Sequence, residues 1–251
     1  MSNAMELAEL SMIQDMERLK IISNNLANVT TVGFKRDISL SASFETALQK
    51  QFSQTGSVDS QQPFQLPDNQ SLVTQVDMQP GTFKFTGNPL DVAIETNAFF
   101  KLYSNGQSFF TRQGNFSIDQ SGRLVSQHGY AVQGTSGDIM LNTSSPRIDS
   151  QGRIWDGDNL VAQLQLYSTG EVSSLEKAGG GIFRFNGAEP HPVNDDSLTL
   201  RPGYLENSNV NTMQAMVNMI ATTRHFESAQ RVMKTYDEMM DSAIRSLGSN
   251  L

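Results

Sequence analysis

The C-terminal end of the chain carries a stripe of mostly apolar side chains that constrains its fold more than any other feature. The stripe advances by alternating steps of four and three residues, as the a and d positions of a coiled coil do. Its members are Ala215, Met219, Thr222, Phe226, Ala229, Met233, Tyr236, Met240, Ala243 and Leu247. One helix over 215–247 would be roughly 50 Å long. We expect it to start after Asn211, a residue that favours helix N-termini, and to stop at Gly248.

The N-terminal end offers a matching stripe with the same alternating steps. It is formed by Met12, Met16, Leu19, Ser23 and Leu26. The polar residues and the glycine that follow, within 24–33, favour a structured turn over continued helix. Each stripe must be buried against something, and there are two candidates. The two helices pack on each other within one molecule, or they pack on the equivalent helices of neighbours in a self-assembling protein; the pattern leaves both open.

Methionine and phenylalanine are segregated along the chain. Most methionines lie near the two ends, whereas most phenylalanines lie within 64–185. The middle also contains short β-branched and aromatic runs separated by glycine turns, which is typical of antiparallel hairpins. The expected strands are 92–94, 99–103, 109–112, 115–118, 123–125, 131–132, 162–167 and 182–185. The sequence thus predicts an α+β fold in which discontinuous N- and C-terminal helices flank a central, mainly antiparallel β domain.

These signals divide the chain into segments. We expect an expression scar at 1–4, a helical assembly domain from 5–38 together with 204–251, an extended connector at 39–79, and a β-rich domain at 80–203.

Two further patterns refine the β domain. Strands 162–167 and 182–185 are expected to pair, with three consecutive glycines lying between them in the sequence. Segment 118–124 is echoed by 148–154, and each predicts a strand, a glycine turn and a strand. Asp119 and Asp149 are then turn residues rather than calcium ligands, because the further acidic positions of a calcium loop are missing.

The composition argues against several classes of function. A net charge of −8 leaves no basic surface for nucleic acid. The absence of cysteine excludes disulfides and thiolate metal sites, and no apolar run is long enough to cross a membrane. His128, His191 and His225 lack metal-ligand spacing, and no nucleophile or phosphate-binding motif is present. We therefore predict no catalytic residue, no cofactor, no metal, no nucleic-acid partner and no membrane insertion.

One enzyme-like alternative stays open at this point. Asp91 and Glu95 flank a predicted strand and are imaginable as the carboxylate pair of a glycoside hydrolase. The chain would then be a β-rich carbohydrate-binding or hydrolytic domain with a coiled-coil tail. In that case these acids should line a cleft.

Three blocks of sequence resemble the bacterial flagellar axial proteins, the rod, hook and hook-associated group. The first block covers 23–36, the second covers 86–130 in pieces, and the third covers 203–220. The positions that carry the resemblance most clearly are Asn24, Asn25, Leu26, Ala27, Asn28, Gly33, Phe34, Leu90, Asp91, Asn209, Val210 and Asn211. The blocks occur in the family's order along nearly the whole chain, so they are specific together.

The resemblance implies a structural subunit of the flagellar rod. It implies that the subunit leaves the cell through the flagellar export apparatus without a cleaved signal peptide and lies in the basal body. Its partners would be its own copies and other axial proteins, rod and hook subunits. The two helical stripes would form the assembly seam of a torque-transmitting tube, with the β domain outside. Within the family, the short connector at 39–79 resembles the proximal rod subfamily more than the distal rod or hook proteins.

Overall fold

The computed structural model describes most of the chain, in two compact units. The described residues are 2–40, 73–141, 146–168, 175–185, 190–193 and 199–248. The helical unit comprises Met1–Leu26, Asp37–Gln75 and Thr212–Leu251, and the β unit comprises Ala27–Arg36 and Val76–Asn211. Most of the predicted connector at 39–79 lies outside the described residues, so its extended conformation stays a prediction.

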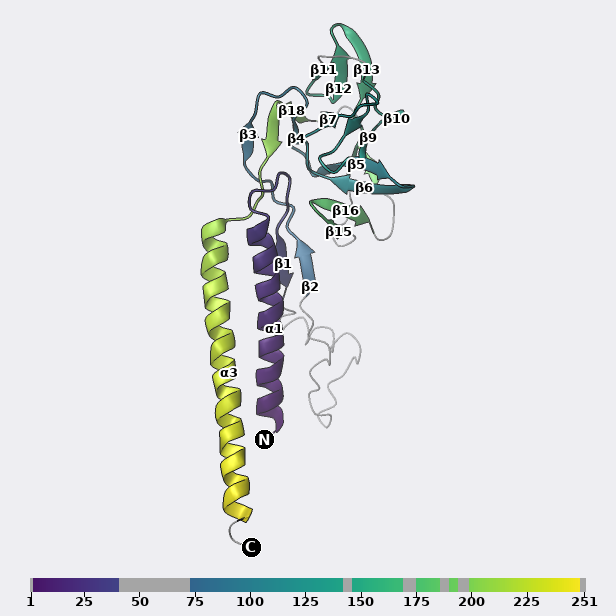
Figure 1. The fold of residues 1–251 in the computed structure, drawn as a ribbon. Coiled ribbons are helices and arrows are strands. Elements are labelled where there is room, and N and C mark those ends of the chain that lie inside the picture. Colours follow the sequence, from purple (N-terminus) through teal and green to yellow (C-terminus); the bar gives the residue numbers. More distant parts are fainter. Residues whose placement is uncertain are drawn as a thin grey trace, which may run out of the picture. The chain divides into compact units, whose positions relative to one another are not determined.

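The helical unit is built on two long helices, α1 (Ser2–Ala27) and α3 (Thr212–Gly248). They run antiparallel beside each other (Figure 1). The unit also contains a short ribbon of β1 (Asp37–Leu40) and β2 (Val73–Val76). Helix α3 begins directly after Asn211 and ends at Gly248, which confirms the predicted bounds. Helix α1 starts at Ser2 and so includes most of the residues that the sequence suggested setting aside.

The β unit consists of short strands, and the described pairs within it are antiparallel. The strands are β3 (Phe83–Phe85), β4 (Val92–Ile94), β5 (Ala98–Ser104), β6 (Gln107–Thr111), β7 (Ser117–Ile118), β8 (Leu124–Val125), β9 (Ala131–Gly134), β10 (Gly137–Asp138), β11 (Pro146–Ile148), β12 (Arg153–Asp156), β13 (Asn159–Gln163), β14 (Leu166–Ser168), β15 (Leu175–Gly179), β16 (Ile182–Phe185), β17 (His191–Pro192), β18 (Leu200–Pro202) and β19 (Tyr204–Glu206). This arrangement confirms the predicted α+β fold.

The strands form one large sheet and several small ones. The main path of the large sheet is β15-β16-β6-β5-β9-β8-β7, with β10 on β9, β14 on β5 and β17 on β14. A second sheet has the order β11-β12-β13, and β18-β4 and β19-β3 are two-stranded ribbons. The ribbons bring the end of the β unit's sequence back to its beginning. Glu206, the last residue of β19, thereby pairs with Phe83 at the start of β3.

The large sheet buries apolar side chains on both faces. Side chains alternate along a strand, so Phe100 and Leu102 of β5 enter the larger core cluster. Phe99, on the opposite face, packs in a smaller cluster with Phe110 and Phe183. The predicted segregation of phenylalanine into the middle of the chain therefore corresponds to a core that belongs to the β unit.

The predicted pairing of 162–167 with 182–185 is wrong. Strand β16 pairs instead with β15 and β6, and the first segment is divided between β13 and β14. All three glycines at 179–181 have positive φ, a conformation that closes a tight hairpin between β15 and β16. Alternation along a strand predicts which side chains are buried, but it carries no information about which strand lies alongside.

The two echoed segments form the same turn. Ser121 N donates to Asp119 Oδ1 over 2.8 Å, and Gln151 N donates to Asp149 Oδ1 over 2.9 Å. The Ser121 hydroxyl and the Arg123 backbone N–H, which also bond to Asp119, lower the pKa of that carboxyl to about 2. Both aspartates are therefore turn residues, as predicted.

Candidate assembly site

The predicted stripe is the face of α3 that is partly buried within one chain. Between 212 and 242, where burial is described, the half-buried positions are Ala215, Met219, Thr222, Phe226, Ala229, Met233 and Tyr236, and the positions between them are exposed. Met240 continues the stripe but is 45% exposed. Leu247 lies within α3, but its side chain is outside the described set.

Helix α1 contributes a polar contact to the helix pair. His225 Nδ1 of α3 lies within hydrogen-bond distance of Asp15 Oδ2 of α1, and Asp15 is only 2% exposed. Of the predicted stripe on α1, Met12, Leu19 and Leu26 are half-buried, whereas Met16 is exposed. The most buried side chains described on this helix are the polar Asp15 and Asn25, so polar groups fix part of the contact in the helical unit.

A second row of apolar side chains on α3 is exposed among the residues that the structure describes. Met213, Met216, Val217 and Ile220 follow the i, i+3, i+4, i+7 spacing of one helix face. All four are exposed, Met213 to 77%. Val232 and Met239 are further exposed apolar side chains toward the C-terminal half. Helix α3 therefore presents both a half-buried stripe and an open apolar face.

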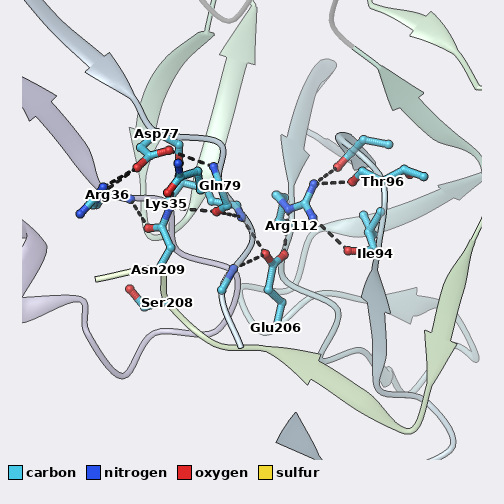
Figure 2. Close-up of polar contacts among 12 residues, drawn as sticks. Lys35, Arg36, Asp77, Gln79, Ile94, Thr96, Arg112, Glu206, Ser208 and Asn209 are labelled. Carbon is cyan, nitrogen blue, oxygen red and sulfur yellow. Dashed lines mark hydrogen bonds and ion pairs between the residues drawn. The ribbon is translucent and has the colours of Figure 1, made fainter. Parts of the chain in front are cut away.

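The base of the β unit is held by three buried charged residues, which we call the ionic clasp: Lys35, Arg112 and Glu206. Lys35 Nζ donates to Glu206 Oε1 over 2.6 Å, and Arg112 Nε donates to Glu206 Oε2 over 2.8 Å. All three side chains are at most 1% exposed. Figure 2 shows the carboxylate of Glu206 between the two cations.

The two cations of the clasp also donate to backbone carbonyls. Lys35 Nζ donates to the Gln79 carbonyl over 2.8 Å. The guanidinium of Arg112 donates to the carbonyls of Ile94, Thr96 and Ala98 over 2.9 to 3.0 Å (Figure 2). Buried charges are tolerated only when they are neutralised and hydrogen-bonded in this way.

The clasp ties together chain segments that lead to the two helices. Lys35 lies shortly after α1 in sequence and Glu206 shortly before α3. Gly33 N donates to the Glu206 carbonyl over 2.7 Å. Arg36 N donates to Asn209 Oδ1 over 2.8 Å, and the Asn209 amide donates to the Asp77 carbonyl over 2.9 Å. The segments that precede and follow the β core are thus bonded to each other in the folded β unit.

The clasp contains two cations but only one carboxylate, and this imbalance shifts the pKa values of its members. Burial lowers the pKa of Lys35, and the neighbouring Arg112 lowers it further, against the opposite effect of Glu206. Burial by itself would raise the pKa of Glu206, but the charges of Arg112 and Lys35 outweigh it and hold that pKa below its usual 4.5. Glu206 therefore supplies the one negative charge of the clasp, which both buried cations share.

Several of the residues that carry the family resemblance make contacts that fix the conformation of the backbone. Asn25 exchanges two hydrogen bonds with the backbone of Asp37, at 2.8 and 2.9 Å. Gly33 has a φ of +65°, and a Cβ there would come within 2.6 Å of the Arg112 backbone. Phe34 is buried and its ring lies 4.3 Å from Lys177 Nζ. These motif residues thus fix the backbone on either side of Lys35 in the sequence.

The other motif positions lie along the same chain segments. Asp91 is buried and accepts a hydrogen bond from the Asn88 amide over 3.0 Å, and Leu90 packs against the larger core cluster. Asn24, Ala27 and Asn28 lie at the end of α1 and in the turn after it, and Val210 and Asn211 lie directly before α3. These positions mark where the helices join the β unit.

The geometry gives no support to hydrolytic chemistry at the acids that the sequence singled out. Glu95 bonds to Arg201, and Asp91 to Asn88, so each carboxylate has a structural partner. Within the described residues there is no group of three or more His, Asp or Glu side chains arranged to hold a metal ion. Among the helices described, none is both long and apolar enough to cross a membrane.

Sequence reasoning did not single out the clasp. Lys35 was part of a basic pair too short to indicate a binding surface, and Arg112 and Glu206 carry no local mark of burial. The only available signal was that each of the three lies in or beside a block that resembles the axial proteins.

Comparison with known proteins covers both ends and the middle of the chain. Residues 5–35 match the family "Flagella basal body rod protein", 93–173 match "Flagellar hook protein FlgE/F/G D1 domain", and 201–246 match "Flagellar basal body rod FlgEFG protein C-terminal". The rod protein FlgF of Mesorhizobium japonicum is 30% identical over 92% of each chain. The rod protein FlgG of Buchnera aphidicola subsp. Acyrthosiphon pisum is 32% identical over 88% of this chain and 91% of its own length.

The chain belongs to the flagellar basal-body rod protein family. It is a structural rod subunit, and the resemblance read from the sequence is confirmed. FlgF and FlgG relatives match this rod protein with similar identity, so similarity alone does not separate the two subfamilies. The clasp takes one residue from each of the three matched regions: Lys35, Arg112 and Glu206. Membership of this family implies the flagellar basal body as the location and other axial proteins as partners.

Proposed function

We propose that this rod protein polymerises through α1 and α3 into the torque-transmitting shaft of the flagellum, with the β unit on the outside. The observation that carries the proposal is the open apolar face of α3, Met213, Met216, Val217 and Ile220, on a helix whose other stripe is already half-buried. A helix that is apolar on two sides is typical of a position inside a bundle. The partners would be the helices of further copies and of other rod and hook subunits.

The energetics favour association over leaving this face in water. Fully burying a side chain of this size contributes about 1.5–3 kcal/mol, and these four are more than half exposed in the single chain. Their burial in an assembled tube would therefore contribute several kcal/mol per subunit, of the order needed to offset the loss of freedom on association.

The stripe also extends past the part that the chain covers by itself. Met240 lies seven residues beyond Met233 and is exposed. The C-terminal end of α3 runs beyond the N-terminal end of α1 in the helical unit (Figure 1). The assembly seam of Met12, Met16, Leu19, Leu26, Met219, Phe226, Met233, Tyr236, Met240 and Leu247 would thus be partly filled within the chain and completed by neighbours.

Met240 gives a sharp test of assembly. Met240→Asp places a charge on the seam at a position that is exposed in the single chain, so the free protein should melt close to the wild type. In the shaft that charge would have to be desolvated, and the variant should fail to restore swimming to cells that lack the native protein. The matched control is Ser228→Asp on an exposed face of α3, which should swim. Normal swimming with Met240→Asp would contradict the proposal.

Within the shaft we propose the proximal, FlgF-like position. The short connector at 39–79 supports it. The test is complementation of two strains of the source species or a close relative, one without its FlgF and one without its FlgG. Restored swimming in the first alone is the expected result, and restored swimming in the second alone would place the subunit in the distal rod.

We also propose that the subunit has no catalytic role and reaches the rod through the flagellar export apparatus without a cleaved signal peptide. The structural partners of Asp91 and Glu95 support the first statement. Sequencing the N-terminus of the subunit from purified basal bodies tests the second. A start at Met5 or within a few residues of it is expected, whereas a start further along the chain, in the C-terminal half of α1 or beyond it, would contradict it.

A further inference from the structure

The β unit carries an aromatic side chain that is unusually exposed and firmly supported. Phe85, at the end of β3, is 66% exposed, the highest value among the aromatic side chains described. Its ring lies 5.1 Å from the Tyr204 ring. Gly87 and Gly203 lie beneath it, where an added Cβ would come within 3.7 and 3.5 Å of the ring. One side of the ring is therefore held in place while the other faces solvent.

A groove with complementary chemistry lies elsewhere on the same unit. It has a volume of about 400 Å³ and runs between the segment that contains β10 and the edge strand β13. Its walls include Met140, Leu160 and Val161, which are three of the exposed large apolar side chains of the β unit. Methionine and branched aliphatic side chains are favourable neighbours for an aromatic ring.

The charges beside these two features are opposite. Lys84, next to Phe85, is exposed on β3. Asp138 lies in the wall of the groove, and Asp158 is exposed in the turn that leads into β13. Asp138 is engaged by Gln133, which leaves Asp158 as the better placed partner for a lysine. Opposite charges around an apolar contact favour one orientation of the partner.

We infer that Phe85 of one subunit inserts into the Met140–Leu160–Val161 groove of a second copy of this chain, with Lys84 set against Asp158. This inference rests on the proposed assembly function and adds a contact between β units to the contact between helices. The occupant is a second copy because Phe85, which we call the knob, and the groove occur on the same chain. They lie on opposite sides of the β unit: β3, which carries the knob, is on one side, and β10 and β13, which line the groove, are on the other (Figure 1).

The contact is heterologous, and this determines what it can build. A knob on one side and a groove on the other leave a free knob and a free groove after every addition, so the contact propagates as an open series instead of closing as a two-fold dimer. Such a series is the geometry that a shaft requires. It also uses the exposed edge strand β13, which a soluble protein would otherwise have to protect from pairing.

The absence of cysteine from the chain makes the contact directly testable. The full chain carrying Lys84→Cys and Asp158→Cys keeps Phe85 and the groove intact and places the two thiols where Lys84 and Asp158 are set against each other. Concentrated under mild oxidation, it should give a ladder of disulfide-linked dimers, trimers and longer species. Each single variant has one thiol and should stop at dimers. The matched control combines Asp158→Cys with Tyr103→Cys, because Tyr103 is another exposed aromatic residue of the β unit. No ladder, or an equal ladder in the control, would overturn the inference.

A mixing experiment tests the same contact without covalent bonds. Phe85→Ser lacks the knob and Leu160→Lys lacks the groove. In sedimentation we expect the wild type to associate at high concentration and each variant alone to lose the part of that association that the β units contribute. A mixture of the two variants should give dimers, because one intact knob and one intact groove remain. A mixture that stays monomeric while the wild type associates would refute the arrangement. Both replaced side chains are exposed, so the melting midpoints should match that of the wild type.

The ladder also separates this inference from the helical assembly proposal. With Met240→Asp added to the double-cysteine variant, the ladder should persist, since the β contact does not involve α3. If the ladder is absent while Met240→Asp still abolishes swimming, only the β contact is wrong. If the ladder forms while Met240→Asp swims normally, the helical assembly proposal fails and the β contact stands.

Discussion

The two units of this rod protein place charged and apolar side chains in opposite ways. In the β unit, Lys35, Arg112 and Glu206 are fully buried in a hydrogen-bonded clasp. In the helical unit, Asp15 and Asn25 are the most buried side chains described, while large apolar side chains are exposed along both helices. No apolar side chain of the described helices is fully buried, whereas the β unit has two apolar core clusters.

This contrast shows which unit is complete within a single chain. The β unit has two apolar core clusters and bonds its buried charged groups to one another and to its own backbone. Among the described residues, the helices leave large apolar side chains exposed, which is typical of an interaction surface. A change in the clasp should therefore act on folding of the β unit, and a change on the helices should act on assembly. The following predictions test that division with one observable, the unfolding of the β unit followed by fluorescence of Trp155, the only tryptophan.

The largest effect is expected for Glu206→Gln. The substitution keeps the shape of the side chain but leaves Lys35 and Arg112 buried without a counter-charge. Breaking a buried ion pair in this way costs about 3–5 kcal/mol, which should appear as a large drop in the urea midpoint at neutral pH. The matched control is Glu95→Gln, which removes an exposed pair with Arg201 and should cost at most about 1 kcal/mol. Equal midpoints for the two variants would mean that the clasp does not stabilise the β unit.

The acid dependence of stability should change with the same residue. The pKa of Glu206 is lowered in the folded state, so its ionised form contributes stability that is fully present above the unfolded-state pKa and is lost as pH falls through the folded-state pKa. The gap in unfolding free energy between the wild type and Glu206→Gln should be widest near neutral pH and should narrow below about pH 4.5. If the gap in unfolding free energy is constant from pH 7 to about pH 3, stabilisation by the clasp does not depend on ionisation of Glu206.

A smaller effect is expected for Lys35→Met. This change removes one of two cations and leaves Arg112 and Glu206 as a neutral pair. The lowered pKa of Lys35 means that its charged form is held at a cost in the folded state. Removing this charge should therefore largely offset the loss of the hydrogen bond to Gln79. We expect the free energy of unfolding to change by about 1 kcal/mol or less. A loss as large as that of Glu206→Gln would indicate that the two cations are equally necessary.

The smallest effect on the β unit is expected for Met233→Asp. Changes outside a core are usually within about 0.5 kcal/mol, so the Trp155 transition should be unchanged. Assembly should nevertheless stop, because the charge would have to be desolvated in every subunit at a cost of several kcal/mol. Cells that depend on this variant should export it and fail to swim. Swimming at normal speed would exclude the stripe as an assembly surface, and a lost Trp155 transition would place α3 in the core of the β unit.

Much of the fold can be predicted from local patterns in the sequence. The four-three spacing from Ala215 onward predicts α3 because an apolar stripe at helical period is stable only as a buried helix face. Asn211 and Gly248 mark its ends because their backbone preferences suit those positions. The repeated turns at Asp119 and Asp149 are equally local, since each carboxylate bonds to amides within a few residues. The family resemblance was readable for the same reason, because its motifs are short and contiguous.

What only the tertiary structure decided are the relations between distant residues. The partner of β16 depends on which edge of the sheet is free, and alternation along a strand carries no information about that. The clasp joins residues separated by as many as 171 positions, and a charged residue shows no mark in the sequence of being buried. The sequence by itself determined the two long helices, most of the expected strands, the two aspartate turns and the family. The fold decided that the charges of Lys35, Arg112 and Glu206 lie inside and that methionines of α3 lie outside, because burial depends on the packing of the whole chain.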